Sequence, residues 1–181
     1  TAFQQLRLDG ALALLGEEES AALSSVQDDE IARLQAIIDG LCDLSLRDPL
    51  TGTANRRHFD SVLDRELDRV ARSGDVALLL MVDIDHFKQV NDQYGHYVGD
   101  LVINHITSIL RHLKIEESMI ARWGGEEFLF MVPKATAQQC RNTCDAIIVA
   151  CQNQPFHFKG EQIDITVSIG ATMFNQFNLD T

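Results

Sequence analysis

The sequence contains no hydrophobic run long enough to cross a membrane. Its longest apolar stretch, from Val76 to Val82, is far shorter than the roughly 20 residues that a spanning helix needs. No basic segment followed by an apolar one marks a secretory signal. We therefore expect a cytoplasmic protein with no membrane segment in this chain. A start at Thr1 is compatible with a piece of a longer protein.

Positive charge is also scarce. The chain has 15 Lys and Arg residues against 27 Asp and Glu residues, which gives a net charge of −12. Such an acidic balance argues against a broad nucleic-acid interface, because that interface needs clustered Lys and Arg. If the substrate carries phosphate groups, a metal ion or local cations must offset the acidity.

Cysteine and histidine do not form a metal-binding pattern. The four cysteines lack the spacing of a zinc site. Cys140, Cys144 and Cys151 share one face of a predicted helix, and we interpret them as reduced thiols in a protein core. His105 and His112 come nearest to helical spacing, and we interpret them as surface or core residues.

The chain is long enough for one domain with an extension, because it has 181 residues of which 45% are hydrophobic. We divide it into a helical lead-in over residues 1–46 and a domain over residues 47–181. Residues 1–27 look helical but weakly patterned. Asp28 or Asp29 can cap a better helix.

That second helix carries an apolar stripe at a/d spacing. The stripe consists of Ile31, Leu34, Ile38, Leu41 and Ser45. We favour a parallel dimer stalk. Ile37 and Leu44 widen the stripe, so a helix packed on its own domain, a helical bundle or docking of a partner protein also stay open.

The domain alternates helices and strands. We predict helices over 55–73, 86–93, 101–113 and 136–154, a loop over 94–100, and strands over 76–84, 118–123, 127–132 and 163–172. Asn55 and Thr136 can cap two of the helices, and Gly74 can close the first of them. The order β-α-α-β-β-α-β predicts an α+β, ferredoxin-like sheet with flanking helices, preceded by the helical stalk.

Two acidic stretches suggest chemistry. Ala121 to Phe130 reads Ala-Arg-Trp-Gly-Gly-Glu-Glu-Phe-Leu-Phe, which predicts a hairpin whose glycines take a positive φ. Glu126 and Glu127 then leave the turn on opposite faces. An acid pair at a hairpin tip makes a poor core but can hold a cation.

The other stretch is an apolar strand that ends in Asp83-Ile84-Asp85 before a helix. Free backbone N–H groups of Phe87 and Lys88 at the helix start suit phosphate oxygens, and Lys88 adds a positive charge. If the strand after Glu126 lies beside Asp83, the two carboxylates can hold Mg²⁺ or Mn²⁺ for phosphoryl transfer. The alternative is that Asp83 caps the helix and Glu126 is a surface acid.

Several separated motifs together resemble the GGDEF family of bacterial diguanylate cyclases. They are Asp48-Pro-Leu-Thr-Gly with Asn55-Arg-Arg, Asp83-Ile-Asp-His-Phe-Lys with Asn91-Asp92, Tyr94-Gly-His with Gly99-Asp100, Arg122-Trp-Gly-Gly-Glu-Glu-Phe, and Thr166-Val-Ser-Ile-Gly. The resemblance covers Asp48 to about Thr172. It implies a palm-type nucleotidyl-cyclase sheet and a Mg²⁺-dependent homodimer that condenses two GTP into cyclic di-GMP and releases two pyrophosphates.

The resemblance also implies roles for single residues. Asp83, the carbonyl of Ile84, and Glu126 would bind the metal ion. Glu126 would accept the proton of the 3′-hydroxyl, Lys88 would stabilise charge, and Glu127 is counted with them as catalytic. The substrate would contact Phe87, Lys88, Asn91, His96 and Asp100, with Asn91 and Asp100 on guanine. From the residues alone, Asn91 could equally be a helix C-cap and Asp100 an N-cap.

Two features depart from the family pattern. The residues Ile115-Glu116-Glu117-Ser118 stand where many members have an Arg-x-x-Asp product-inhibition site, so we predict that this site is lacking. The family's further helix, with an Ala-Leu-Tyr-x-Ala-Lys-like run, does not occur before Thr181.

The alternative function is a catalytically weak module that binds GTP or cyclic di-GMP and signals through protein contacts. A purely structural dimerisation module is a third. A sensor domain or a regulatory protein could act on the N-terminal helices.

Overall fold

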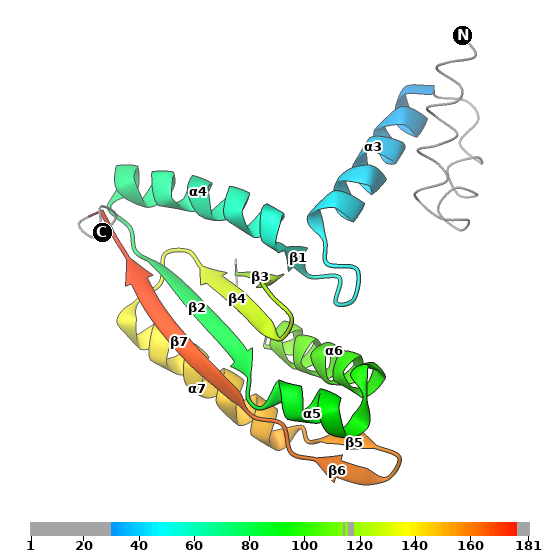
Figure 1. Cartoon of the computed structure of the whole chain (residues 1–181). Coiled ribbons are helices and arrows are strands. Elements are labelled where there is room, and N and C mark those ends of the chain that lie inside the picture. Colours follow the sequence, from blue (N-terminus) through cyan, green and yellow to red (C-terminus); the bar gives the residue numbers. More distant parts are fainter. Residues whose placement is uncertain (1–29, 114, 116–117, 177–181) are drawn as a thin grey trace. The chain divides into compact units, whose positions relative to one another are not determined.

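The computed structural model describes residues 30–113, 115 and 118–176, and the chain divides into two compact units, Thr1–Arg47 and Asp48–Thr181 (Figure 1). The described element of the first unit is helix α3 (Glu30–Leu46), where the sequence predicts a helix. The helical segments predicted over residues 1–27 and the cap at Asp28 or Asp29 lie outside the described residues.

The second unit is built on a five-stranded sheet with the strand order β1-β3-β4-β2-β7. The strands are β1 (Ala54–Asn55), β3 (Met119–Arg122), β4 (Glu127–Val132), β2 (Ala77–Ile84) and β7 (Val167–Phe174). β1 runs parallel to β3, and the other neighbours are antiparallel. The sequence predicts β2 as a central strand because both of its faces are apolar, and its place between β4 and β7 confirms this.

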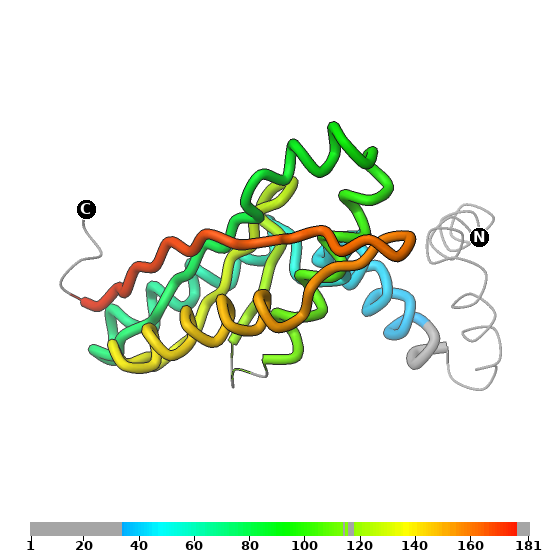
Figure 2. The backbone as a smooth tube through the Cα atoms, turned by 90° about the horizontal axis from the view of Figure 1, so that it is seen from below, coloured from blue at the N-terminus to red at the C-terminus, as the bar shows by residue number. Residues whose placement is uncertain are grey.

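Helices flank the sheet, which confirms the predicted α+β class. They are α4 (Arg56–Ser73), α5 (Phe87–Tyr94), α6 (His96–His112) and α7 (Ala137–Asn153). Figures 1 and 2 both show α7 running along β7. Among the described helices, none is both long and apolar enough to pass through a bilayer.

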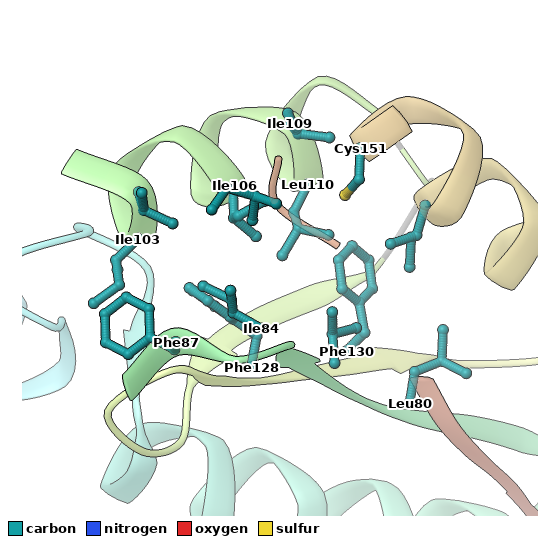
Figure 3. Packing of buried hydrophobic residues seen from close by; sticks show 14 of the residues in the cluster. Leu80, Ile84, Phe87, Ile103, Ile106, Ile109, Leu110, Phe128, Phe130 and Cys151 are labelled. Atoms are coloured by element: carbon teal, nitrogen blue, oxygen red, sulfur yellow. The ribbon is translucent and has the colours of Figure 1, made fainter. Parts of the chain in front are cut away.

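The core forms because alternate residues of β2 and β4 face opposite sides of the sheet. On one side, side chains of β2 and β4 pack with α6 and with Cys151 of α7 (Figure 3). This cluster includes Leu80, Ile84, Phe128, Phe130, Ile103, Ile106, Ile109 and Leu110. On the other side, Phe59 of α4 packs with Leu129 and Met131. Burial raises the pKa of the Cys151 thiol to about 11, so this cysteine is uncharged at neutral pH.

The predicted helix ends are confirmed by their hydrogen bonds. The Asn55 side chain accepts a hydrogen bond from the His58 N–H at 3.0 Å and so begins α4. Gly74 ends α4 with a φ of 73°, which glycine adopts easily. Thr136 begins α7 with a capping box that includes Gln139.

Two predictions about elements were wrong, and some short strands were missed. Residues 94–100 are not a loop, because α6 already begins at His96 and Gly95 alone separates it from α5. The strand predicted over 163–172 is two strands, because β6 (Glu161–Ile163) ends before β7 begins. β6 pairs with β5 (Phe156–Phe158) in a separate hairpin, which the sequence analysis missed together with β1. Strands of two or three residues are too short to show a period.

Candidate active site

The register of β2 and β4 gathers three acidic residues at one end of the sheet. Asp83 of β2 lies directly opposite Glu127, the first residue of β4. Directly opposite residues place their side chains on the same face. The N–H of Ile84 donates to the carbonyl of Glu126 at 3.4 Å, so Glu126 sits beside the next position of β2. The hairpin strand therefore lies beside Asp83, as expected, with Glu127 on the same face as Asp83 and Glu126 in the turn just before β4.

The acidic residues at this end of the sheet are half-buried and form no ion pairs in the described part of the chain. They are Asp83, Glu126 and Glu127. Also within the described part of the chain, no three acidic, histidine or cysteine side chains are arranged to hold a metal ion by themselves.

The hairpin glycines serve a different purpose from the predicted one. Neither Gly124 nor Gly125 adopts a left-handed φ, so the expected positive φ is wrong. A Cβ at Gly124 would instead collide with the carboxylate of Glu127. The carbonyl of Glu127 also accepts hydrogen bonds from the N–H groups of Trp123 and Gly124, at 2.8 Å and 3.3 Å. A side chain at position 124 would therefore displace the end of the Glu127 side chain, onto which the turn folds.

An arginine fixes this turn to the start of the domain. The Arg122 guanidinium donates to the carbonyl of Gly125, at 2.7 Å from Nη2 and 3.2 Å from Nε. Its Nη1 donates to both oxygens of Asp48 at 3.3 Å. Burial raises the pKa of Asp48, but hydrogen bonds from Thr51 and the charge of Arg122 outweigh it and hold that pKa below its usual range. The sequence analysis had not assigned Asp48 and Arg122 a role in the site.

Helix α5 begins immediately after β2 with an unusual residue. His86 is its N-cap, with a φ of 56° and no side-chain capping bond. The alternative reading of Asp83 as the cap of this helix is therefore wrong. The carbonyl of His86 accepts from Gln89 and Val90, so the amides of Phe87 and Lys88 have no intrahelical acceptor. The Lys88 side chain is exposed, as a phosphate contact requires.

Asp85 is a second acid at this end of the sheet, and its role is different. Its carboxylate accepts hydrogen bonds from the hydroxyls of Ser168 and Thr166, both at 2.6 Å. These two bonds hold the pKa of Asp85 below its usual range, against a smaller effect of burial. Both oxygens are thus already used to join the end of β2 to the start of β7. The sequence analysis missed this link because its members are 81 and 83 positions apart.

The residues expected on guanine lie around the α5–α6 corner. Asn91 is half-buried on α5, while His96 and Asp100 are exposed in the first turns of α6. Gly95 is both the C-cap of α5 and the N-cap of α6. The alternative readings of Asn91 as a C-cap and of Asp100 as an N-cap are therefore wrong. With capping excluded, the two polar side chains remain available for a ligand.

The chain is similar in sequence to a known protein family and to several known proteins. The family model described as "Diguanylate cyclase, GGDEF domain" matches residues 45–181. The diguanylate cyclase DgcP of Pseudomonas aeruginosa is 36% identical over 185 residues, which cover 93% of this chain and 27% of that protein. The response regulator PleD of Caulobacter vibrioides is 32% identical over 138 residues, covering 75% of this chain and 30% of PleD. The chain thus spans less than a third of the length of these two relatives.

Solved structures agree with the fold and extend over the helical lead-in. The coiled coil and GGDEF domain of DgcB from Caulobacter crescentus, in complex with c-di-GMP, matches with a TM-score of 0.77 and 30% identity. That match covers 90% of this chain and 86% of the DgcB chain. Diguanylate cyclase SiaD from Pseudomonas aeruginosa, in complex with its activator SiaC, matches with a TM-score of 0.71 and 31% identity, over 96% of this chain and 69% of that one.

Proposed function

The chain belongs to the GGDEF-domain diguanylate cyclase family, and from that premise we propose that it condenses two GTP molecules into cyclic di-GMP with release of two pyrophosphates. The single observation that carries the proposal is the register of β2 and β4. It brings Asp83, Glu126 and Glu127 to the end of the sheet where α5 begins with two amides that have no intrahelical acceptor. Carboxylates beside a phosphate-binding helix start are what metal-assisted phosphoryl transfer needs.

In this proposal each side chain has a defined task. Asp83, the carbonyl of Ile84, and Glu126 would hold Mg²⁺ or Mn²⁺, which when bound neutralises phosphate charge and favours ionisation of the attacking hydroxyl. The amides of Phe87 and Lys88 bind phosphate oxygens, and the Lys88 ammonium stabilises the charge that develops on them. Glu127 lies opposite Asp83, and its backbone carbonyl closes the hairpin turn by accepting from the N–H groups of Trp123 and Gly124.

The reaction requires two copies of the domain. The 3′-oxygen of one GTP forms a bond to the α-phosphorus of the other, and the bond from that phosphorus to the β-phosphate oxygen breaks. The 3′-hydroxyl proton goes to Glu126, and pyrophosphate leaves. Repetition in the other direction closes the ring. Two facing sites raise the effective concentration of the reactants, so dimerisation controls the rate.

Selection of guanine is assigned to Asn91 and Asp100 around the α5–α6 corner, where His96 also holds the nucleotide. Guanine presents N1–H and its exocyclic amine as adjacent donors, and a carboxylate such as that of Asp100 can accept both. Adenine lacks this pair, so a site built for the two bonds discriminates against ATP. The exposure of Asp100 on α6 supports this assignment, since the carboxylate is accessible to a base.

The first test is production of cyclic di-GMP from GTP and Mg²⁺ by the full chain, followed by chromatography. We expect product from the wild type, and a loss of at least about 100-fold in D83N and in E126Q, because catalytic proton transfer and metal assistance each contribute factors of this size. D145N is the matched control, since Asp145 is an exposed acid on α7.

The outcomes separate the candidate functions. A wild-type protein that binds GTP but makes no product would support the binding module instead of the cyclase. Unchanged turnover in D83N would contradict the proposed metal site.

The same progress curves also test product inhibition. Ile115 packs against the core, and its carbonyl accepts a hydrogen bond from the Ser118 hydroxyl at 2.7 Å. We therefore propose that no inhibitory site forms there, and that the rate stays constant as cyclic di-GMP accumulates.

We further propose that α3 forms a dimer stalk and receives the regulatory input. Leu34, Ile38 and Leu44 are large hydrophobic residues that α3 exposes. An exposed stripe of this kind is covered by another helix in a parallel dimer or by a partner protein. The match to SiaD, which was solved with its activator, supports a protein partner as one source of control.

A further inference from the structure

Gly99 is a glycine that the backbone does not require. It lies in the second turn of α6, and its φ is outside the left-handed region that favours glycine. Alanine would be the better residue for this helix, because glycine loses more conformational freedom on folding and lacks a side chain to pack. Gly99 is also buried, so it is not a tolerated surface substitution on the solvent-facing side of the helix. Another requirement must be met at this position.

That requirement is space for Asn91. A Cβ at Gly99 would collide with Oδ1 of Asn91 and would lie 3.0 Å from its Cγ. It would also lie 3.1 Å from Cζ of Phe87. The Phe87 ring cannot give way easily, because it is only 8% exposed and packs in the core, where Figure 3 shows it beside Ile103 of α6. Relief of the collision must therefore come from Asn91.

The two helices cannot simply separate. The Gly95 N–H donates to the carbonyl of Asn91 at 2.9 Å, and the Gly99 N–H donates to the carbonyl of Gly95 at 3.2 Å. This ties the end of α5 to the start of α6 across a single residue. Val98 and Val102, on either side of Gly99, are buried and fix α6 on the core. A methyl group at position 99 would therefore rotate the Asn91 carboxamide away from its place.

We propose that Gly99 is a positioning residue for substrate: the absence of its side chain sets the Asn91 carboxamide in the orientation that binds guanine. This inference rests on the proposed function, in which Asn91 contacts the base. Gly99 itself touches no substrate. Its effect on GTP passes entirely through Asn91, which distinguishes it from a residue that only helps the two helices pack.

The test is a double-mutant cycle on the full chain with G99A, N91A and the double variant N91A/G99A. Binding of ribose-labelled fluorescent GTP and ATP is titrated in the presence of Mg²⁺, and thermal unfolding is followed in parallel. We expect G99A to bind GTP roughly three- to tenfold more weakly, the loss of about one hydrogen bond, with little change for ATP. In the N91A background, G99A should cause no further loss.

N104A is the matched control, because Asn104 is exposed on the same helix and the change also introduces alanine. It should leave GTP affinity unchanged. If G99A proves unstable but N91A/G99A melts like the wild type, the collision at Asn91 is still supported. Equal GTP affinity of G99A and wild type would overturn the inference, as would an equal effect of G99A with and without Asn91. A wild type that binds neither nucleotide would refute the proposed function itself, a result distinct from these two.

Discussion

At the scale of single residues, the two carboxylates of the Asp83-Ile84-Asp85 segment have opposite environments. Asp83 has no cationic partner among the described residues and faces Glu127. Asp85, two positions later on the same face, has both oxygens occupied by hydroxyl groups. In the described part of the chain, Asp83 thus lacks an ion-pair partner, whereas Asp85 links β2 to β7. The sequence shows both acids but not which of them is hydrogen-bonded to β7.

The Asp85 link predicts a pH-dependent contribution to stability. S168A should lower the free energy of unfolding at pH 7 by about 1 kcal/mol, the value of a hydrogen bond to a partly exposed charged group. Because the folded-state pKa of Asp85 is lowered, this stabilisation is present above the unfolded value of about 3.9 and is lost as the pH falls through the folded-state pKa. Urea unfolding of wild type and S168A from pH 3 to 7 measures the difference.

The control for that experiment is T172A, at an exposed position on the same strand. Its difference from the wild type should not change with pH, because no carboxylate depends on that side chain. A difference between wild type and S168A that persisted unchanged to pH 3 would show that the Ser168 hydroxyl does not act through the charge of Asp85.

At the scale of elements, an ion pair between Arg122 and Asp48 connects the β3–β4 hairpin to the turn at the start of the second unit. The Arg122 side chain spans from the carbonyl of Gly125 to the carboxylate of Asp48, which is 74 positions away. Both charged side chains are largely buried, with exposed fractions of 17% and 16%. The turn that carries Glu126 is therefore held by a contact between the last residue of β3 and Asp48, which lies outside the hairpin.

Removal of that contact should affect both stability and turnover. R122A should lower the free energy of unfolding by about 2–3 kcal/mol, because Asp48 would be left buried without its partner. R122K should recover part of the stability but not the rate, since lysine cannot bridge two acceptors in a planar fork. Chemical denaturation and steady-state cyclase assays, with kcat and KM for GTP separated, measure the two effects.

R141A serves as the control because Arg141 is exposed on α7, away from the hairpin. If Arg122 positions Glu126, kcat should fall with little change in KM. Wild-type kcat in R122A, despite reduced stability, would leave Arg122 with a structural role only.

At the scale of the whole molecule, the proposed reaction needs two domains, and the described part of each chain holds one set of site residues. α3 ends at Leu46, two residues before Asp48, where the second unit begins. α3 is thus close in sequence to the turn that Arg122 fixes. A dimer stalk would set both the concentration of facing sites and the point at which a signal enters the domain.

This proposal predicts that charge on the stalk lowers association and activity together. I38E, at an exposed apolar position of α3, should shift the protein from dimer to monomer in sedimentation velocity. Cyclase activity per molecule should fall more than about tenfold at low protein concentration and recover as concentration rises. Thermal stability of the second unit should not change, since that unit has its own core.

Q35E is the comparison for I38E, because Gln35 is exposed on the same helix and lies outside the a/d stripe. It adds the same charge without entering the proposed interface. A monomeric wild type with full activity, or an I38E protein that remains dimeric and active, would contradict the stalk proposal and favour docking of α3 on another partner.

The sequence by itself determined the features that are encoded locally. Periodicity placed the long helices and β2, and the cap residues Asn55, Gly74 and Thr136 marked their ends, because these signals depend on neighbours within one or two turns. The acidic stretches around Asp83 and Glu126 could be recognised for the same reason. The order of elements then restricted the fold to a small number of topologies.

Only the tertiary structure decided how distant segments meet. The sequence could not show that Asp83 lies opposite Glu127, or that Asp85 is taken by Ser168. Strand register and side-chain pairing depend on which segments of the folded chain come together, and no local pattern records this. Gly99 shows the limit most clearly. In the sequence it read as part of a loop, and only the packing of α6 against Asn91 gives a reason for glycine there.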